Sequence, residues 1–310
     1  MVRTEAISVG PEVLFLRPGR MGRVIAVLRN TVYLESDNEG IVGIVGGGAV
    51  DGPLSLRVEN LESVLAALNG REGASFHATG ESLEIDGSVS VGWTRAHRWV
   101  PELPSHVGTR EDRVQAARAL ANEIARTRQA EGFGALVPYL PELSDCAGTV
   151  VAPPGNALLR ITIYHLDQFS GAMREGCAEE AAEALASLLG LGPGLTPSGD
   201  DLVAGILAML VWRARLGGAT VGATRRVAPT SGLVHWVRAQ APLRTNRISA
   251  RLLWHAGRGS LYAPAMAVGA ALLGGNPDAI RGPAQRLFSI GATSGVDLAA
   301  GMLFAASVAI

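Results

Sequence analysis

The stretch LGLGPGLTPSGDDLVAGIL, residues Leu189–Leu207, constrains the fold more than any other part of this sequence. Its first half, Leu189–Pro197, holds three glycines and two prolines, which exclude a regular helix there, whereas the apolar run after Asp201 predicts one. The stretch SGVDLAAGML, residues Ser294–Leu303, repeats the helical half with seven identities in ten aligned positions. We therefore expect two related helices, each beginning at its serine.

Both copies carry a glycine in the eighth position, Gly205 and Gly301. A glycine inside a helix costs about 1 kcal/mol relative to alanine, so its repetition calls for a packing reason. We expect the two helices to lie side by side, with their N-termini on one face and Asp297 facing the glycine-rich turn. A serine followed three residues later by an acid also fits a capping box, which makes Ser198 and Ser294 the predicted N-caps.

The glycine-rich turn, residues Gly190–Gly199, predicts an anion site. Alternating glycines leave backbone N–H groups open, and the helix that begins at Ser198 directs the positive end of its dipole into the turn. A second polar cluster, Arg244–Ser249, opens another helix with Thr245 as the expected N-cap, and its arginines suit carboxylate or phosphate. The alternative interpretation of the glycine-rich turn is a tight turn whose polar residues only cap the following helix. The alternative for Arg244–Ser249 is an exposed, capped helix start without a ligand. The residues expected to bind a small anionic substrate are Gly192, Gly194, Thr196, Ser198, Gly199, Arg244, Thr245, Arg247, Ser249, Thr293, Ser294 and Asp297.

Asp200 and Asp201 are the expected catalytic residues. Two carboxylates beside a helix N-terminus repel a bare phosphate, and Mg²⁺ held by both would reconcile them with a phosphorylated ligand. The alternative is a carboxylate that accepts hydrogen bonds from an amide or carbamoyl NH₂ group. Because Asp201 fits the helix cap and Asp200 does not, we expect Asp200 to serve ligand binding alone and Asp201 to support the fold as well.

The composition favours a globular cytoplasmic protein. Hydrophobic residues make up 48% of the 310 residues, enough for a large core, and charged residues make up 18%. The formal net charge of -1 argues against binding to nucleic acid. All positive side chains are arginines, which excludes a P-loop lysine or a Schiff-base lysine. Cys146 and Cys177 form no CxxC pair, and every apolar run is shorter than the ~20 residues that cross a bilayer, so we expect no membrane segment.

The order of the patterns predicts an α+β fold, with a small antiparallel β-rich part (1–104) followed by a packed, mostly helical domain (105–310). The boundary is expected near Pro101–Gly108, and Thr109 is a good N-cap. The predicted strands are Val24–Leu28, Thr31–Glu35, Ile41–Val45, Ser75–Thr79, Ser82–Ile85, Ser88–Trp93 and Leu158–Tyr164, and Pro138–Pro154 is expected to be a loop. The predicted helices are Asn60–Asn69, one from Thr109 to Gly132, Gln168–Leu189, Ser198–Leu216, Gly232–Gln240, Thr245–Gly257, Ala263–Leu273, Pro277–Ile290 and Ser294–Ile310.

The blocks GLGPGLTPSGDDLVAGIL, RTNRIS, LLWHAGRG and GATSGVDLAAG, all within Leu189–Gly301, resemble the signature blocks of a bacterial family. The family is typified by AllH, a subunit associated with oxamate carbamoyltransferase in anaerobic allantoin breakdown. The resemblance implies transfer of a carbamoyl group between oxalurate and phosphate, together with other subunits. Both substrates are anions, in agreement with the turn and the arginines.

Three functions therefore remain open at the level of sequence. The favoured one is a carbamoyltransferase-type subunit, a transferase that works by orientation and electrostatic stabilisation. The others are a Mg²⁺-dependent phosphoryl-transfer enzyme and a non-catalytic assembly subunit. The expected partners are a small anionic substrate, further subunits of the complex and a second copy of the chain in a homo-oligomer.

Overall fold

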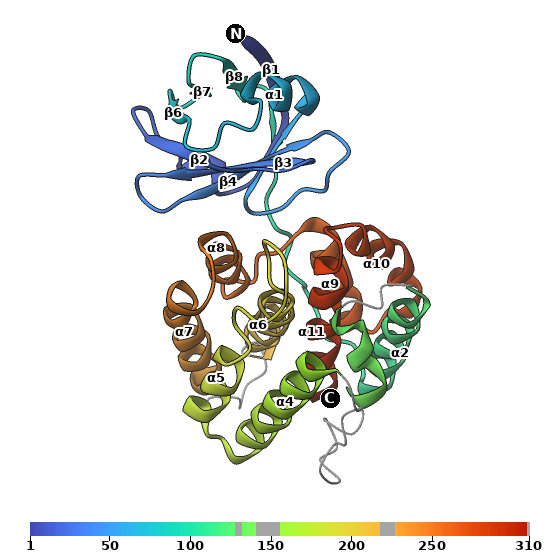
Figure 1. Cartoon of the computed structure of the whole chain (residues 1–310). Helices are drawn as coiled ribbons and strands as arrows, with labels where there is room; N and C mark the ends of the chain where they lie inside the picture. Colours follow the sequence, from blue (N-terminus) through green and yellow to red (C-terminus); the bar gives the residue numbers. More distant parts are fainter. Residues whose placement is uncertain (128–131, 141–155, 218–226, 309–310) are drawn as a thin grey trace. The chain divides into compact units, whose positions relative to one another are not determined.

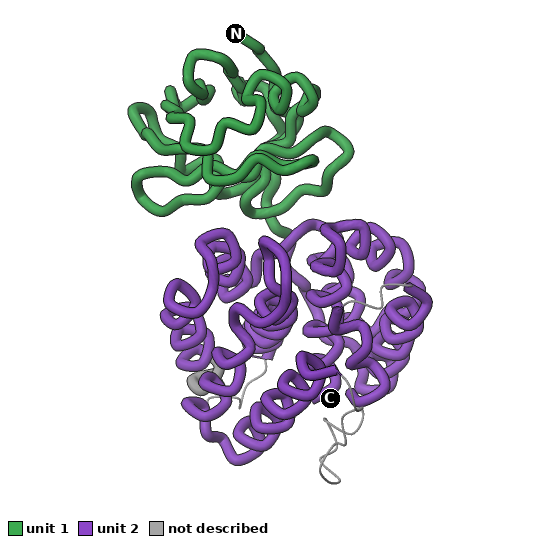
Figure 2. Tube along the Cα trace, in the orientation of Figure 1, with its two compact units in different colours: residues 1–101 green, residues 102–310 purple. Residues whose placement is uncertain are grey.

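The computed structural model describes residues 1–127, 132–140, 156–217 and 227–308. The chain divides into two compact units, Met1–Pro101 and Glu102–Ile310 (Figure 2). The first unit is built mainly of strands and the second of helices, which confirms the α+β class (Figure 1). Among the helices of the described residues, none combines the length and the hydropathy needed to cross a membrane.

The strands of the first unit close into a barrel. They pair in the order β5-β4-β3-β2-β6-β7-β8-β1, and β1 pairs again with β5. The strands are β1 (Val2–Val9), β2 (Met21–Val27), β3 (Thr31–Ser36), β4 (Ile41–Gly46), β5 (Ser55–Val58), β6 (Ser75–Ala78), β7 (Ser82–Ile85), β8 (Val89–Gly92) and β9 (His97–Arg98).

The prediction that this sheet is antiparallel is wrong in part, because the sheet is mixed. β1 runs parallel to β8 and to β9, and β4 runs parallel to β5. Consecutive strands joined by short turns are antiparallel, as the sequence predicts. At the turn between β7 and β8, both Asp86 and Gly87 have positive φ, as hairpin turns require. The parallel pairs include strands far apart in the chain, and such pairing leaves no turn signal in the sequence.

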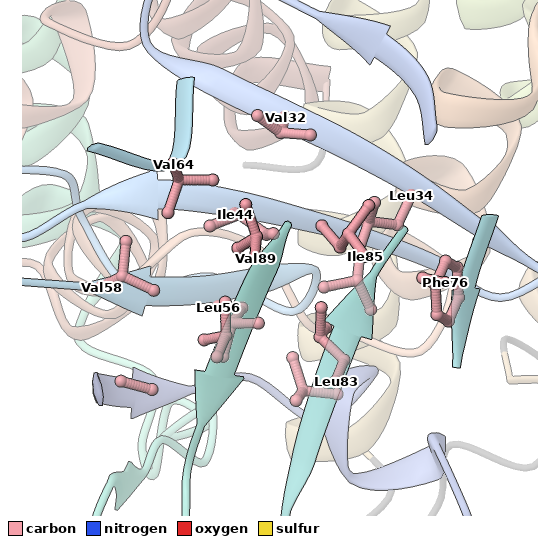
Figure 3. Close-up of a cluster of buried hydrophobic side chains, with 14 of the residues drawn as sticks. Val32, Leu34, Ile44, Leu56, Val58, Val64, Phe76, Leu83, Ile85 and Val89 are labelled. Atoms are coloured by element: carbon pink, nitrogen blue, oxygen red, sulfur yellow. The ribbon is translucent and has the colours of Figure 1, made fainter. Parts of the chain in front are cut away.

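The interior of the barrel is filled by the inward-facing side chains of its strands (Figure 3). The helix α1 (Leu61–Leu68) adds Val64 and Leu68 to this core. It begins where the Asn60 side chain accepts a hydrogen bond from the Ser63 N–H, and it ends at Asn69 in the left-handed conformation.

The second unit is a packed set of helices (Figure 1). Thr109 caps α2 as predicted, since its side chain accepts a hydrogen bond from the Asp112 N–H. The elements are α2 (Arg110–Arg126), η2 (Phe133–Tyr139), α4 (Ala157–Glu175), α5 (Ala178–Ala186), α6 (Ser198–Gly217), α7 (Val227–Arg244), α8 (Arg247–Ala256), α9 (Ala263–Gly274), η3 (Pro277–Ala279), α10 (Arg281–Phe288) and α11 (Ser294–Val308). Most of the loop predicted for Pro138–Pro154 lies outside the described residues.

The strand predicted for Leu158–Tyr164 is wrong, because this segment belongs to α4. The Asn156 side chain caps the helix by accepting from the Leu159 N–H. Buried residues then recur at helical spacing, at Leu159, Thr162, Ile163 and Leu166. The short β-branched run dominated the local pattern, but the apolar spacing over a longer window is that of a helix.

The two helices that carry the repeated motif, α6 and α11, form the centre of the second unit. Every residue of α6 from Ser198 to Leu210 is buried, and so is every residue of α11 from Gly295 to Ala305. The two helices have the most extensive contact of any pair of elements in the described residues. The prediction that they lie side by side is confirmed.

Their backbones touch at the two glycines of the motif. A Cβ atom on Gly205 would overlap the carbonyl oxygen of Leu298, and a Cβ atom on Gly301 would overlap that of Leu202. Leu202 and Leu298 are equivalent positions in the two copies, as are the glycines. The glycine of each copy thus contacts the equivalent leucine of the other copy, as expected for parallel helices related by a local two-fold axis.

We expect Gly301→Ala to lower the free energy of unfolding by about 1–3 kcal/mol, the usual effect of overpacking a core. Gly232→Ala is the matched control, because Gly232 also lies in a helix and a Cβ there meets no atom within 4 Å. Without a clash, alanine should stabilise that helix slightly. Urea unfolding of both variants measures the difference, and equal midpoints would contradict the close helix contact.

Candidate functional site

The N-terminal ends of α6 and α11 meet, and their polar side chains bond across the helix pair. The Ser294 hydroxyl donates to the Asp201 carboxyl group, and the Ser198 hydroxyl donates to that of Asp297. These two bonds are counterparts, because each joins the serine of one copy to the acid of the other. The hydroxyls of Thr196 and Ser294 share a further hydrogen bond of 2.8 Å.

This arrangement corrects the predicted capping boxes. The Asp201 N–H donates to the carbonyl of Pro197, and the Asp297 N–H donates to that of Thr293. Pro197 and Thr293 therefore occupy the N-cap positions, since the N-cap carbonyl accepts the first bond of a helix. Each serine is the first residue inside its helix, where its hydroxyl reaches the acid of the neighbouring helix instead of its own.

Asp201 and Asp297 are buried carboxyl groups with unused bonding capacity. Their relative exposures are 1% and 0%. In Asp297, Oδ1 accepts a hydrogen bond of 2.5 Å from the Phe133 N–H, and Thr293 adds a side-chain bond. The Oδ2 atom of each aspartate has no hydrogen-bond partner within the described ranges. A buried polar atom without a partner is costly, so a ligand that bonds to both oxygens would relieve that cost.

Burial raises the pKa of both carboxyl groups. For Asp201 the pKa is raised well above the usual value, first by burial and then by the negative charges of Asp297 and Asp200. Hydrogen bonds from Ser294 and Thr196 oppose this shift without cancelling it. For Asp297, burial also raises the pKa and hydrogen bonds oppose it. Two neighbouring carboxyl groups in such a setting resist double ionisation, so the pair tends to retain a proton.

Asp200 has an environment that the sequence did not predict. Its Oδ1 accepts a hydrogen bond of 2.8 Å from the Gly190 N–H, and its Oδ2 accepts from the Thr245 hydroxyl. Ser249 adds a third hydrogen bond. Burial raises the pKa of Asp200, and these three bonds oppose the shift. Asp200 thus ties the start of α6 to the glycine-rich turn and to α8, and its expected role in ligand binding and catalysis stays a prediction.

The geometry gives little support to Mg²⁺ held jointly by Asp200 and Asp201. Consecutive residues of a helix point about 100° apart, and both oxygens of Asp200 already accept hydrogen bonds. The described residues contain one set of three side chains with metal-ligating geometry, Glu175, Cys177 and Glu180, which lies between α4 and α5. Its two glutamates are exposed, and such groups are common without an ion.

The glycine-rich turn uses several of its backbone groups to hold itself together. The Gly199 N–H donates to the Leu191 carbonyl at 2.8 Å, and a Cβ on Gly199 would overlap the Leu188 carbonyl. Gly192 and Gly194 have φ angles of 105° and 102°, a backbone conformation that residues other than glycine rarely adopt. Glycine is therefore required by the shape of the turn, and anion binding by Gly192 and Gly194 stays a prediction.

The start of α8 contains a residue that the sequence analysis missed. Asn246, and not Thr245, is the N-cap, because its side chain accepts hydrogen bonds from the N–H groups of the second and third helical residues. Its amide nitrogen donates to the Leu195 carbonyl at 2.7 Å, which fixes the turn. Asparagine immediately before a helix is itself a capping signal that could have identified it.

The two arginines of this cluster are Arg244, the last residue of α7, and Arg247, the first residue of α8. Arg244 forms an ion pair of 2.7 Å with Glu183. Arg247 is exposed in the first turn of α8. Anion binding by these arginines stays a prediction, whereas Thr196, Ser198, Thr293, Ser294 and Asp297 are brought together with Asp201.

The fold and the site define an α+β protein whose helical unit carries two buried carboxyl groups at the shared N-terminal end of a parallel helix pair. Residues 188–306, which include both helices, match the family model described as oxamate carbamoyltransferase subunit AllH. The match confirms the resemblance inferred from the motif blocks and covers a segment of the helical unit. Comparison with curated proteins and with solved structures gave no match.

We expect Asp200→Ala to lower the free energy of unfolding by about 1–3 kcal/mol, because it leaves the donors of Gly190 and Thr245 without their acceptor. Asp278→Ala, at an exposed aspartate of η3, is the control and should change stability by less than about 0.5 kcal/mol. Thermal unfolding compares the two. A melting temperature of Asp200→Ala equal to that of the wild type would instead favour a role of Asp200 in ligand binding alone.

We expect the stability of the wild type to fall as pH rises above about 4, the ordinary pKa of an aspartate. Because burial raises the pKa of Asp201 in the folded protein, the folded state binds a proton that the unfolded chain releases. This contribution is present at low pH and is lost as pH rises through the raised pKa. Asp201→Asn should flatten the dependence, and Asp278→Asn should leave it unchanged. Urea unfolding between pH 4 and 8 measures it, and parallel profiles for all three proteins would contradict the raised pKa.

Proposed function

We propose that this chain is a carbamoyltransferase-associated subunit whose helical unit binds a small substrate with a carbamoyl or primary amide group. One observation carries the proposal. Asp201 and Asp297 both lie within the segment that matches the AllH family model and are buried together, and each has one oxygen with no hydrogen-bond partner among the described residues. AllH is described as a subunit, so the proposal includes further subunits that complete the enzyme.

The chemistry of the pair suits an amide. A carboxyl pair that retains one proton offers one O–H donor and one carboxylate acceptor. A carbamoyl group offers the complement, a carbonyl oxygen that accepts and an NH₂ group that donates. Bonding to both would satisfy the two free oxygens and hold the group in one orientation. Orientation and fixed hydrogen bonds then account for the contribution of this chain to catalysis.

The nearby hydroxyl groups suit the anionic end of such a substrate. Thr196, Ser198, Thr293 and Ser294 lie at the two helix N-termini, where the dipoles favour negative charge. A Mg²⁺-dependent phosphoryl transfer receives less support, because both oxygens of Asp200 are engaged in hydrogen bonds. A non-catalytic assembly subunit would leave the two free carboxyl oxygens without a purpose.

The proposal is tested by calorimetric titration of the chain with oxamate and with oxalate, which replaces the amide by a second carboxylate. We expect oxamate to bind more tightly than oxalate. Asp201→Asn and Asp297→Asn should each weaken oxamate binding by about tenfold or more, since a hydrogen bond to a charged group contributes about 1.5–3 kcal/mol. Asp278→Asn should bind as the wild type does.

Two results would contradict the proposal. If neither oxamate nor carbamoyl phosphate binds, with or without Mg²⁺, the chain is better explained as an assembly subunit. If oxamate binds equally to the wild type and to both site variants, the carboxyl pair is not the binding site. Binding that depends strictly on Mg²⁺ would favour phosphoryl transfer.

A further inference from the structure

Three arginines surround one tryptophan on the helical unit, away from any role described above. Trp254 lies in α8, and the guanidinium carbons of Arg251, Arg258 and Arg238 lie 4.4, 4.8 and 5.2 Å from its ring centre. Arg251 is on α8, Arg258 follows the helix, and Arg238 comes from α7. Each separation is within the range of a cation–π contact.

The cluster brings three positive charges together, and two of the arginines lack an acidic partner among the described residues. Within the part of the chain that the structure describes, neither Arg238 nor Arg258 forms an ion pair. The pKa of Arg238 is lowered, first by burial and then by the charges of Arg258 and Arg251. The chain as a whole is nearly neutral, with a formal net charge of -1, so this concentration is local.

Arg238 carries a buried donor that is not used. Its Nε atom is buried and has no hydrogen-bond partner among the described residues. The stem of the side chain lies against Gly257, where a Cβ would approach Arg238 Cδ to 2.6 Å. The absence of a side chain at Gly257 therefore lets Arg238 lie beside the turn that carries Arg258. A buried donor of a charged group is expensive to leave without an acceptor.

We propose that Arg238, Arg251 and Arg258 bind a small, multiply charged anion with a phosphate-type group beside Trp254. Guanidinium groups match the oxygens of such an anion with paired N–H donors. The anion would supply the counter-charge that Arg238 and Arg258 lack among the described residues, while the Trp254 ring lies against the three guanidinium groups. Trp254 is half-buried and Arg258 is exposed, so the cluster is open to solvent. The proposal does not depend on the function assigned to Asp201 and Asp297, because it rests on different residues.

Calorimetric titration of the whole chain with inorganic pyrophosphate, at constant ionic strength set with sodium chloride, tests the proposal. We expect saturable binding to the wild type. Arg258→Gln and Arg238→Gln should each weaken it by about tenfold or more, the effect of losing a charged hydrogen bond. Arg286→Gln is the control, because it removes one exposed positive charge from α10 of the same unit and should change affinity less than about twofold.

The proposal is overturned if pyrophosphate does not bind saturably, or if Arg286→Gln weakens binding as much as Arg258→Gln. The same titration is repeated with an oligoglutamate peptide in place of pyrophosphate. If the peptide binds through Arg258 while pyrophosphate does not, the cluster is a docking surface for an acidic protein and not a small-anion site. Melting temperatures of all variants verify that each one is folded, and the exposed position of Arg258 makes its replacement the most informative.

Discussion

The direct contact between the backbones of α6 and α11 is the constraint on which the candidate site depends. Packed helices are ordinarily separated by about 8–10 Å, a distance set by the side chains between them. Gly205 and Gly301 remove those side chains, and each lies against a carbonyl of the other helix. Only at this close approach can a hydroxyl as short as that of serine reach an acid on the neighbouring helix. The glycines thus make the exchange of hydrogen bonds between the two copies possible.

Two opposing electrostatic effects act on the carboxyl groups that this contact brings together. The N-terminal dipole of a helix stabilises a nearby carboxylate by about 0.3–1 kcal/mol, or about 2 kcal/mol in partly buried settings. Burial disfavours the charged form, and for Asp201 and Asp297 the pKa is raised, so burial prevails. Hydrophobic residues of similar size would often be more stable at such positions. The electrostatic cost of these two acids, together with the oxygens that have no partner among the described residues, is the reason for proposing that the pair binds a ligand.

Sequence reasoning predicted the elements whose signals are local. The hairpin at Asp86–Gly87, the start of α2 at Thr109 and the α6–α11 pair follow from turn residues, capping residues and a repeated motif. It did not predict the parallel strand pairs or the bonds of Asp200, because these join residues far apart in the chain. At the candidate site, the motif identified the serines and acids that the structure brings together. It could not show that each serine bonds to the acid of the other copy, since a capping box has the same spacing.

The two copies are not identical, and the differences assign distinct roles to the two acids. Asp200 of the first copy is replaced by Val296 in the second, so only the first helix anchors the glycine-rich turn. Asp297 accepts a backbone hydrogen bond from Phe133, and such a bond stabilises the ionised form. Among the described residues, no backbone N–H donates to the Asp201 carboxyl group, whose pKa is raised by burial and by the charges of Asp297 and Asp200. A carbamoyl group bound between the two acids, as proposed, would direct its carbonyl oxygen toward the protonated carboxyl group and its NH₂ group toward the ionised one. The unequal surroundings of Asp201 and Asp297 would then favour one orientation of the bound group over the other.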